Sequence, residues 1–258
     1  MGYWEDRQAQ ALNRLSNKSA KAIEKQMVKY YQRTMERVIS DFEATYNKLL
    51  ATVGDGKQPT PADLYKLDKY WKLQAQARDE LERLGAKQIA LLSKNFEANW
   101  FEVYYSINIE GATAFSTLDK SAVEQMINQI WCADGKNWSS RIWSNTTELL
   151  ETLNDELVNI VASGKKSTVL KNILQERFGV SYSRAEALVR TELAHIQTQA
   201  AKKRYEDYGV QEVEIWADED ERRCEHCGKL HQKRYPVGAA VPIPAHPRCR
   251  CCILPVIE

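Results

Sequence analysis

The sequence has almost no net charge and no long apolar run. It holds 36 Lys and Arg against 35 Asp and Glu, so a nucleic-acid partner would have to bind a local basic patch rather than the chain as a whole. No apolar run approaches the roughly 18 residues that cross a bilayer. Acids at Glu5 and Asp6 replace the basic flank of a signal peptide, and Asp6 stands where N-myristoylation needs Ser or Thr. We therefore expect no membrane segment, export signal or lipid anchor, and a chain that stays in the cytoplasm in which it is made.

Strand signals are scarce, and helical periodicity dominates the first part of the chain. From Lys18 to Leu50, apolar residues recur every three or four positions, which predicts one long amphipathic helix. The segment 53–61 breaks this pattern, and Thr60 with Pro61 supplies the N-cap and first turn of a second long helix. The two helices should pack as an antiparallel hairpin. The expected apolar faces comprise Ile23, Met27, Tyr31, Met35, Val38, Phe42, Tyr46 and Leu49, and then Leu64, Leu67, Trp71, Leu81, Leu84, Leu92, Phe96, Trp100 and Val103.

After Gly111 the pattern changes to shorter helices and ends in strands. Helical spacing covers 121–131, 138–163, 165–178 and 183–208, and C-terminal caps are expected at Gly164, Gly179 and Gly209. Period-two alternation at 212–215 predicts a half-buried strand, and 251–258 predicts a second one. The fold class is therefore mainly α with a small α+β C-terminal module. We expect a helical hairpin over residues 1–110 and the second region over 111–258.

Five of the six cysteines and three of the four histidines lie between residues 224 and 252. In a reducing cytoplasm such a cluster indicates a metal site rather than disulfides. Two pairs of ligands from separate segments complete the tetrahedral shell that Zn²⁺ prefers, and a metal would fix the proline-rich loop between them. The candidate ligands are Cys224, Cys227, His246 and one of Cys249 and Cys251, which point to the same side of an extended segment. Cys252 is expected to be a packed thiol.

Two alternatives to a structural zinc site are buried thiols without metal and a catalytic zinc. A catalytic zinc needs an open position for water and a nearby carboxylate base. Glu225 lies inside the first ligand pair, and the acids of 218–221 precede the site. We therefore expect a closed, structural site and no catalytic residues.

Basic residues surround the cluster and are candidate contacts for nucleic-acid phosphates. The only acid among residues 222–250 is Glu225. The alternative is that these residues neutralise the acidic stretch 212–221, and the sequence favours neither. The candidates for nucleic-acid binding are Arg222, Arg223, Lys233, Arg234, Arg248 and Arg250.

A second polar group lies on the helix predicted over 183–208. Arg190, Glu192 and His195 could in principle do acid/base chemistry, but a buried ion pair that ties this helix to the metal module is the favoured interpretation. Trp138 is expected to anchor the core. Arg141 could pair with Glu192 or with Glu186, and the sequence does not choose between them.

Over about residues 111–258 the chain resembles the phage head-morphogenesis or minor capsid proteins with a MuF-like domain. The resemblance rests on WSSRIW at 138–143, LVRTELAHIQTQAA at 188–201, the stretch from Asp220 to Cys227, and PAHPRCRC at 244–251. His231 and Tyr235 depart from the residues that the family often has there. The resemblance implies an internal virion protein that acts with the portal protein in head assembly and in handling packaged DNA. It implies no enzymatic activity for this domain, which acts in the host cytoplasm during assembly and later in the capsid interior.

Scaffold protein, major capsid protein and double-stranded DNA are further candidate partners. The alternative function is a zinc-dependent nuclease or nucleic-acid modifying enzyme, in which only His226 or His231 could be the catalytic histidine outside the zinc shell. A DNA-binding zinc finger does not fit, because no finger helix follows the second ligand pair. The partner interface is expected on the hairpin, whose aromatic residues exceed what one hairpin can hide. These residues are Tyr30, Tyr31, Trp71, Trp100 and Tyr104.

Overall fold

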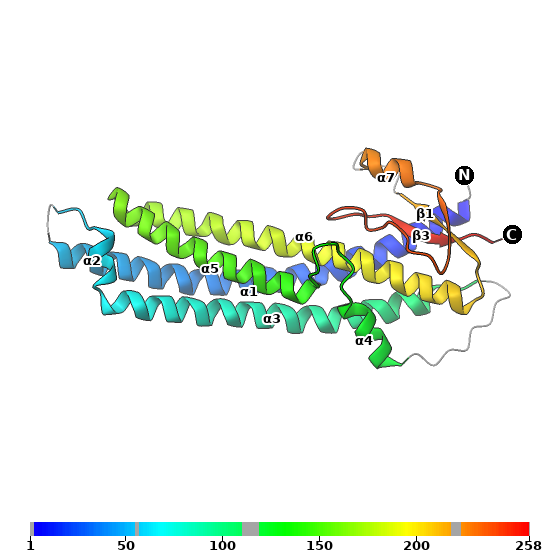
Figure 1. Ribbon diagram of the computed structural model, residues 1–258, viewed down its shortest axis with the longest axis horizontal. Coiled ribbons are helices and arrows are strands. Elements are labelled where there is room, and N and C mark those ends of the chain that lie inside the picture. The colour runs from blue at the N-terminus through cyan, green and yellow to red at the C-terminus, as the bar shows by residue number, and fades with distance from the viewer. Residues whose placement is uncertain (1–2, 55–56, 110–118, 218–222, 258) are drawn as a thin grey trace. The chain divides into compact units, whose positions relative to one another are not determined.

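A computed structural model describes residues 3–54, 57–109, 119–217 and 223–257. This part of the chain is mainly α-helical, with one small three-stranded sheet, which confirms the predicted fold class (Figure 1). The helices are α1 (Tyr3–Val53), α2 (Pro61–Tyr65), α3 (Asp68–Ser106), α4 (Lys120–Asn128), α5 (Trp138–Ser163), α6 (Ser167–Asp207) and α7 (Glu225–Leu230). The strands are β1 (Glu212–Trp216), β2 (Arg234–Pro236) and β3 (Cys252–Pro255).

The chain forms two compact units. The first consists of Met1–Glu24, Leu91–Trp138 and Glu186–Glu258, and the second of Lys25–Ala90 and Ser139–Ala185. Residues of α1, α3 and α6 belong to both units. The boundary expected near residue 110 falls in the segment 110–118, which lies outside the described residues, so the division into 1–110 and 111–258 stays a prediction.

In the second unit, parts of α1, α3, α5 and α6 pack side by side as a bundle (Figure 1). The helices α1 and α3 are antiparallel, and Arg37 of α1 forms an ion pair with Glu80 of α3 at 3.2 Å. The apolar stripes explain the packing, because side chains three or four positions apart lie on one helix face. The stripes are buried at Met27, Val38, Phe42, Tyr46, Leu49, Leu73, Leu81, Leu84, Leu149, Leu153, Leu157, Leu170, Leu174 and Phe178.

One buried polar cluster connects all four helices of this bundle. The hydroxyl of Tyr31 (α1) lies 3.2 Å from Oγ of Ser181 (α6), and Nδ2 of Asn145 (α5) donates to the Tyr31 oxygen at 3.3 Å. The Tyr31 hydroxyl also lies 3.5 Å from Oε1 of Gln88 (α3). Burial raises the pKa of Tyr31 to about 12. Because buried polar groups need partners, this cluster favours one alignment of the four helices.

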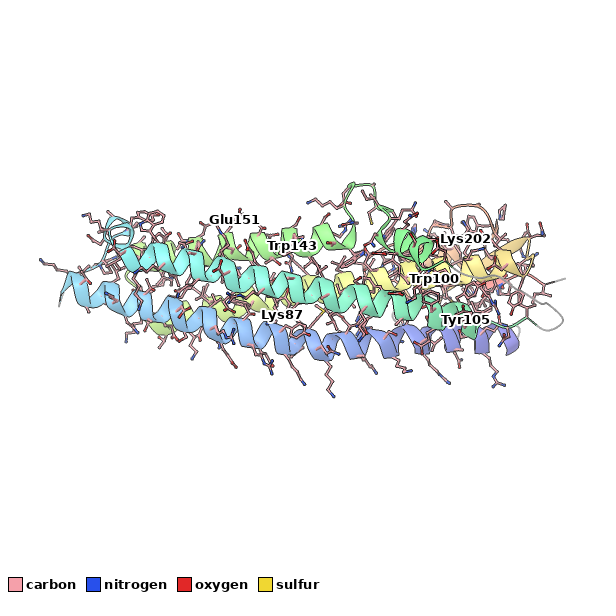
Figure 2. All side chains as sticks on the ribbon, turned by 90° about the horizontal axis from the view of Figure 1, so that it is seen from below. Lys87, Trp100, Tyr105, Trp143, Glu151 and Lys202 are labelled. Carbon is pink, nitrogen blue, oxygen red and sulfur yellow. The ribbon has the colours of Figure 1, made fainter. Side chains whose placement is uncertain are left out.

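A close contact lies near the polar cluster. A Cβ at Gly85 of α3 would lie 2.7 Å from the ring of Trp143 of α5. Figure 2 labels Trp143. Glycine therefore costs some helix propensity here but lets α5 approach α3.

The connection between α1 and α3 confirms one expectation and corrects another. Thr60 caps α2 through a reciprocal hydrogen-bonded box with Asp63. The second helix is not continuous, however, because α2 ends at Tyr65 and α3 begins at Asp68. This break shifts the apolar phase, so that Tyr70 is buried and Trp71, expected on the apolar face, is 61% exposed.

Two other helices are longer than the sequence pattern predicted. The first begins at Tyr3 rather than Lys18, and Ala9, Leu12 and Ala20 continue its buried stripe. The helix α6 runs through Gly179 without a break, so the predicted cap there is wrong. Tertiary packing of the flanking residues outweighs the weak helix propensity of a single glycine.

The glycines that follow the C-terminal ends of α5 and α6 are helix caps, as predicted. Gly164 and Gly209 adopt φ of +63° and +75° where α5 and α6 end. The position after the last helical turn often has a left-handed backbone conformation, which glycine adopts at little steric cost. The segment predicted to be helical over 121–131 ends earlier, since α4 stops at Asn128 and Trp131 lies in the following loop.

The first unit contains the sheet, in the order β2-β1-β3 with antiparallel pairs. Val213 and Ile215 of β1 are fully buried, which confirms the predicted strand. Helix α6 is joined to the sheet because the buried Tyr205 hydroxyl donates to the carbonyl of Ile253 in β3 at 3.2 Å. The terminal strand was predicted, whereas β2 and α7 were not, because three and six residues are too short for a periodic signal.

Candidate metal centre

Two separate segments bring cysteines and a histidine together in the first unit. Cys224 is the N-cap of α7, and its sulfur accepts a hydrogen bond from the backbone N–H of Cys227 at 3.3 Å. His246 and Cys249 come from the segment between β2 and β3. Nε2 of His246 lies 3.4 Å from the sulfur of Cys224 and 3.1 Å from that of Cys227. The sulfurs of Cys227 and Cys249 are 3.9 Å apart.

These distances match the edges of a tetrahedral zinc site. With Zn–S bonds of about 2.3 Å and a Zn–N bond of about 2.0–2.1 Å, two sulfur ligands lie about 3.8 Å apart, and a sulfur and a nitrogen about 3.6 Å apart. The S···N and S···S separations around Cys227 lie within about half an ångström of these values. The donor atoms are thus arranged so that one ion can contact several of them.

His246 is oriented for binding a metal. Its Nδ1 lies 2.8 Å from the carbonyl oxygen of Pro247 and donates to it. The other ring nitrogen, Nε2, then carries the lone pair that points toward the two sulfurs. A metal-binding histidine commonly has such a second hydrogen bond, which fixes its tautomer and ring orientation.

Cys227 belongs to two overlapping groups of donors. One consists of Cys224, Cys227 and His246, and the other of Cys227, Cys249 and Cys251, with the donor atoms of each group within 4.8 Å of one another. The sequence predicted all five residues, and the fold brings all five together. Both Cys249 and Cys251 remain candidates for the fourth position, and each group can hold a metal ion.

The electrostatics of the thiols also fit a cation. A hydrogen bond from the Cys251 thiol lowers the pKa of Cys249 to about 5, and the same contact raises the pKa of Cys251. Burial raises the pKa of Cys227 to about 12. One thiolate therefore forms at the expense of its neighbours, because several negative sulfurs repel one another at this spacing. A divalent ion removes that repulsion and stabilises additional thiolates.

The segment with His246 and Cys249 is attached to helix α6 by the residue between them. Arg248 adopts φ of +59°, its backbone N–H donates to Oγ1 of Thr191 at 3.0 Å, and its Nε donates to Glu186 at 2.8 Å. A second guanidinium nitrogen also contacts Glu186. Burial would raise the pKa of Glu186, but the hydrogen bonds from Arg248 and Arg190 outweigh it and lower that pKa.

The other predicted nucleic-acid contacts differ in their exposure. Arg223, Lys233 and Arg234 are exposed, and Arg250 is half-buried. Arg222 lies outside the described residues. Arg248 is exposed as well, and its guanidinium and backbone contact Glu186 and Thr191 of α6.

Several polar residues of α6 form ion pairs and hydrogen bonds with other segments. Arg190 forms ion pairs with Glu24 of α1, at 2.7 Å, and with Glu186. Glu192 is buried and accepts a hydrogen bond from Nε1 of Trp131 at 3.0 Å. Glu186, one turn before Arg190, contacts Arg248 of the metal segment.

Three further predicted residues lie in the core or close to it. His195 is buried and stacks on Trp131 with ring centroids 4.3 Å apart, and burial lowers its pKa to about 4. Trp138 is 3% exposed and contacts Phe96 edge to face, as expected of a core anchor. Arg141 is half-buried on α5, and its pairing with Glu186 or Glu192 stays a prediction.

The two histidines of the nuclease alternative differ in their surroundings. His226 is exposed on α7. His231 follows α7, packs edge-on against Trp216 and accepts a hydrogen bond from the backbone N–H of Ala217 at 3.2 Å. Cys252 is buried in β3 and belongs to neither donor group, as expected of a packed thiol.

Sequence reasoning missed Glu186, Thr191 and Trp131 as supports of this region. Glu186 and Arg190 are four residues apart on one helix, which is a local signal for an ion pair. Their contacts with Arg248 and Glu24 join distant segments and have no such signal.

None of the described helices combines the length and the apolar character needed to span a bilayer. No curated protein and no solved structure matches the chain. Residues 151–254, less than half of the chain, match the family model described as phage Mu protein F like protein. This segment includes the second half of α5, all of α6, β1, α7 and β2, most of β3, and all candidate metal ligands. The match confirms the resemblance noted in the sequence: residues 151–254 are similar to the phage Mu protein F like family.

Proposed function

We propose that the chain is a minor capsid protein of a tailed phage or prophage that acts with the portal protein in procapsid assembly and in handling packaged DNA. The observation that carries this proposal is the match of residues 151–254 to the phage Mu protein F like family, which supports a role in head morphogenesis. The chain would be present in the host cytoplasm during assembly and in the capsid interior afterwards. Scaffold protein, major capsid protein and double-stranded DNA are further partners to test.

In this proposal the metal is Zn²⁺ and its role is structural. Cys224, Cys227 and His246 would hold it, together with Cys249 or Cys251. Bound zinc would cross-link α7 to the segment before β3, and so fix a loop that contains Pro236, Pro242 and Pro244 and little secondary structure of its own. The spacing of the donor atoms and the orientation of His246 support this role.

We further propose that the chain has no enzymatic activity of its own. The environments of the histidines support this. His195 is buried against Trp131, His231 packs on Trp216, and His246 points at two cysteine sulfurs. A general base must reach the group from which it takes a proton, and these contacts hold all three rings in other roles.

The proposed function is tested by assembly. The tagged full-length chain is produced in cells that make phage heads, and procapsids are purified by sedimentation with and without the portal gene. We expect the chain in procapsids that contain the portal, and little in those that lack it. Equal amounts in both preparations would contradict the portal as partner, and absence from both would contradict the role in heads. Incubation of the purified, zinc-loaded chain with plasmid DNA should leave the plasmid intact, and cleavage that His231→Ala abolishes would favour the nuclease alternative.

A further inference from the structure

A rigid aromatic cluster lies exposed at the corner of the second unit where α1, α2 and α3 meet. Tyr65 and Trp71 are 45% and 61% exposed. Both rings pack edge to face on the buried Tyr70, at centroid distances of 5.4 and 5.2 Å. Nε1 of Trp71 also donates to the carbonyl of Tyr65 at 3.2 Å. The two exposed rings are therefore fixed in position before any partner binds.

An open groove with a partly apolar lining adjoins this cluster along the chain. Its apolar walls are Leu49 and Val53, in the last turns of α1, and Leu67. Its polar rim includes two lysines and one acid. The lining residues are Leu49, Thr52, Val53, Lys57, Gln58, Asp63, Lys66 and Leu67. The aromatic cluster and the groove together are called the corner surface below.

The corner surface is surrounded by lysines. The turn between α5 and α6 lies at the same end of the bundle, because Nε2 of Gln58 donates to the carbonyl of Ala162 at 3.0 Å and the Tyr46 hydroxyl donates to that of Lys165. Among the described residues of this end, the nearby acids are Asp63, which caps α2, Asp68, and Asp155 of α5, which interacts electrostatically with Tyr70. The lysines are Lys48, Lys57, Lys66, Lys69, Lys72, Lys165 and Lys166, of which only Lys66 lies within 4.0 Å of a carboxylate of the described residues.

We infer that the corner surface docks a partner protein that presents an apolar pocket surrounded by carboxylates. This inference rests on the proposed function in head assembly, which requires a protein contact, and it places that contact. Tryptophan and tyrosine at the centre of a surface with a charged rim are typical of protein interfaces, in which such aromatic residues contribute most of the affinity. The lysine rim selects an acidic partner and speeds its approach.

A DNA backbone fits the corner surface less well. Phosphates would use the lysines but would leave the rigid Trp71 ring and the apolar groove without a role. The aromatic stripe of the hairpin was expected to form the partner interface, but only part of it is exposed. Tyr31, Trp100 and Tyr104 of that stripe are buried in the structure, and Trp71 is the one left largely exposed.

The test compares matched variants of the full-length chain. Trp71→Ala removes the central ring, and the double variant Lys66→Glu with Lys69→Glu reverses part of the rim. Tyr105 is 59% exposed on α3 and therefore provides the aromatic control, Tyr105→Ala. The charge control is Lys87→Glu, also at an exposed position of α3; both control residues are labelled in Figure 2. Each purified variant is sedimented with procapsids assembled in cells that lack the chain and, separately, with double-stranded DNA, and thermal unfolding verifies that each variant is folded.

We expect Trp71→Ala to weaken binding to procapsids by about tenfold or more, since loss of a central aromatic has effects of this size. The double lysine variant should also bind more weakly, whereas both controls should bind like the parent chain. Binding of Trp71→Ala within twofold of the parent would overturn the inference and leave the proposed function intact. Loss of DNA binding in the lysine variant, with normal procapsid binding by Trp71→Ala, would identify a DNA surface instead. If the parent chain itself fails to bind procapsids, the proposed function fails, and the inference fails with it.

Discussion

Glu186 of α6 holds the metal-binding segment through Arg248, and replacing it with glutamine measures what this contact contributes to metal binding. Two guanidinium nitrogens of Arg248 contact the carboxylate of Glu186. The backbone contact of Arg248 with Thr191 is separate and stays in place. The substitution therefore removes a charge-assisted contact without removing a metal ligand.

The size of the effect follows from the exposure of the two side chains. Hydrogen bonds to charged groups contribute about 1.5–3 kcal/mol when they are well shielded. The Glu186 side chain is 18% exposed, but that of Arg248 is 47% exposed, so solvent screens part of the interaction. Glutamine also keeps one acceptor oxygen. We expect the substitution to cost about 1–2 kcal/mol of zinc binding, which is about a 5- to 30-fold rise in Kd.

The assay is a competition for zinc between the purified full-length chain and a chromophoric chelator. Glu206→Gln, at an exposed position of the same helix, is the control and should bind zinc like the parent. A double-mutant cycle with Arg248→Ala isolates the energy of the contact between Glu186 and Arg248, because the second substitution adds little once the first has removed that contact. A Kd for Glu186→Gln within twofold of the parent would refute the idea that α6 positions the metal segment.

Three further predictions concern the metal, one histidine and one glycine. Cys227→Ser should abolish stoichiometric zinc binding, measured by elemental analysis, because Cys227 belongs to both donor groups, whereas Cys252→Ser should bind one zinc per chain like the parent. Burial lowers the pKa of His195 to about 4, against about 6.5 in the unfolded chain, so the unfolded chain takes up a proton first and stability should fall by at most about 3 kcal/mol as the pH drops from about 6.5 to 4. Denaturant titrations should show a weaker fall in His195→Gln. Gly85→Ala should destabilise the chain by about 1–3 kcal/mol through the contact with Trp143, and Trp143→Ala should relieve that strain in the double variant.

Periodicity predicted most of the helical fold, because the long helices bury one continuous stripe. The bounds of α5 match the prediction at both ends, and the Thr60 cap of α2 is as expected. Trp71 is an exception, because it lies on the exposed side of α3. A two-residue break before Asp68 changes the helix phase, and a periodic pattern read across that break assigns the wrong face.

The cluster of candidate metal ligands was predictable because its residues occur in two short segments with characteristic spacing. One helical turn connects Cys224 to Cys227, and one loop turn connects His246 to Cys249. The local backbone therefore already brings the two side chains of each pair close together. The fold determines how the two pairs are placed relative to each other. The structure does this by pairing β1 with β3 and by attaching Arg248 to α6.

The contact between Arg248 and Glu186 has a consequence for how the metal binds. The residues are 62 positions apart, so the contact exists only when α6 and the metal segment are already in place. It therefore orders His246 and Cys249 without help from a metal, and it lowers the conformational entropy that binding would otherwise lose. Metal-dependent folding should then be confined to the loop and α7, while α6 and the sheet hold their structure in the metal-free chain. Hydrogen exchange with and without zinc tests this, and loss of protection in α6 on zinc removal would contradict it.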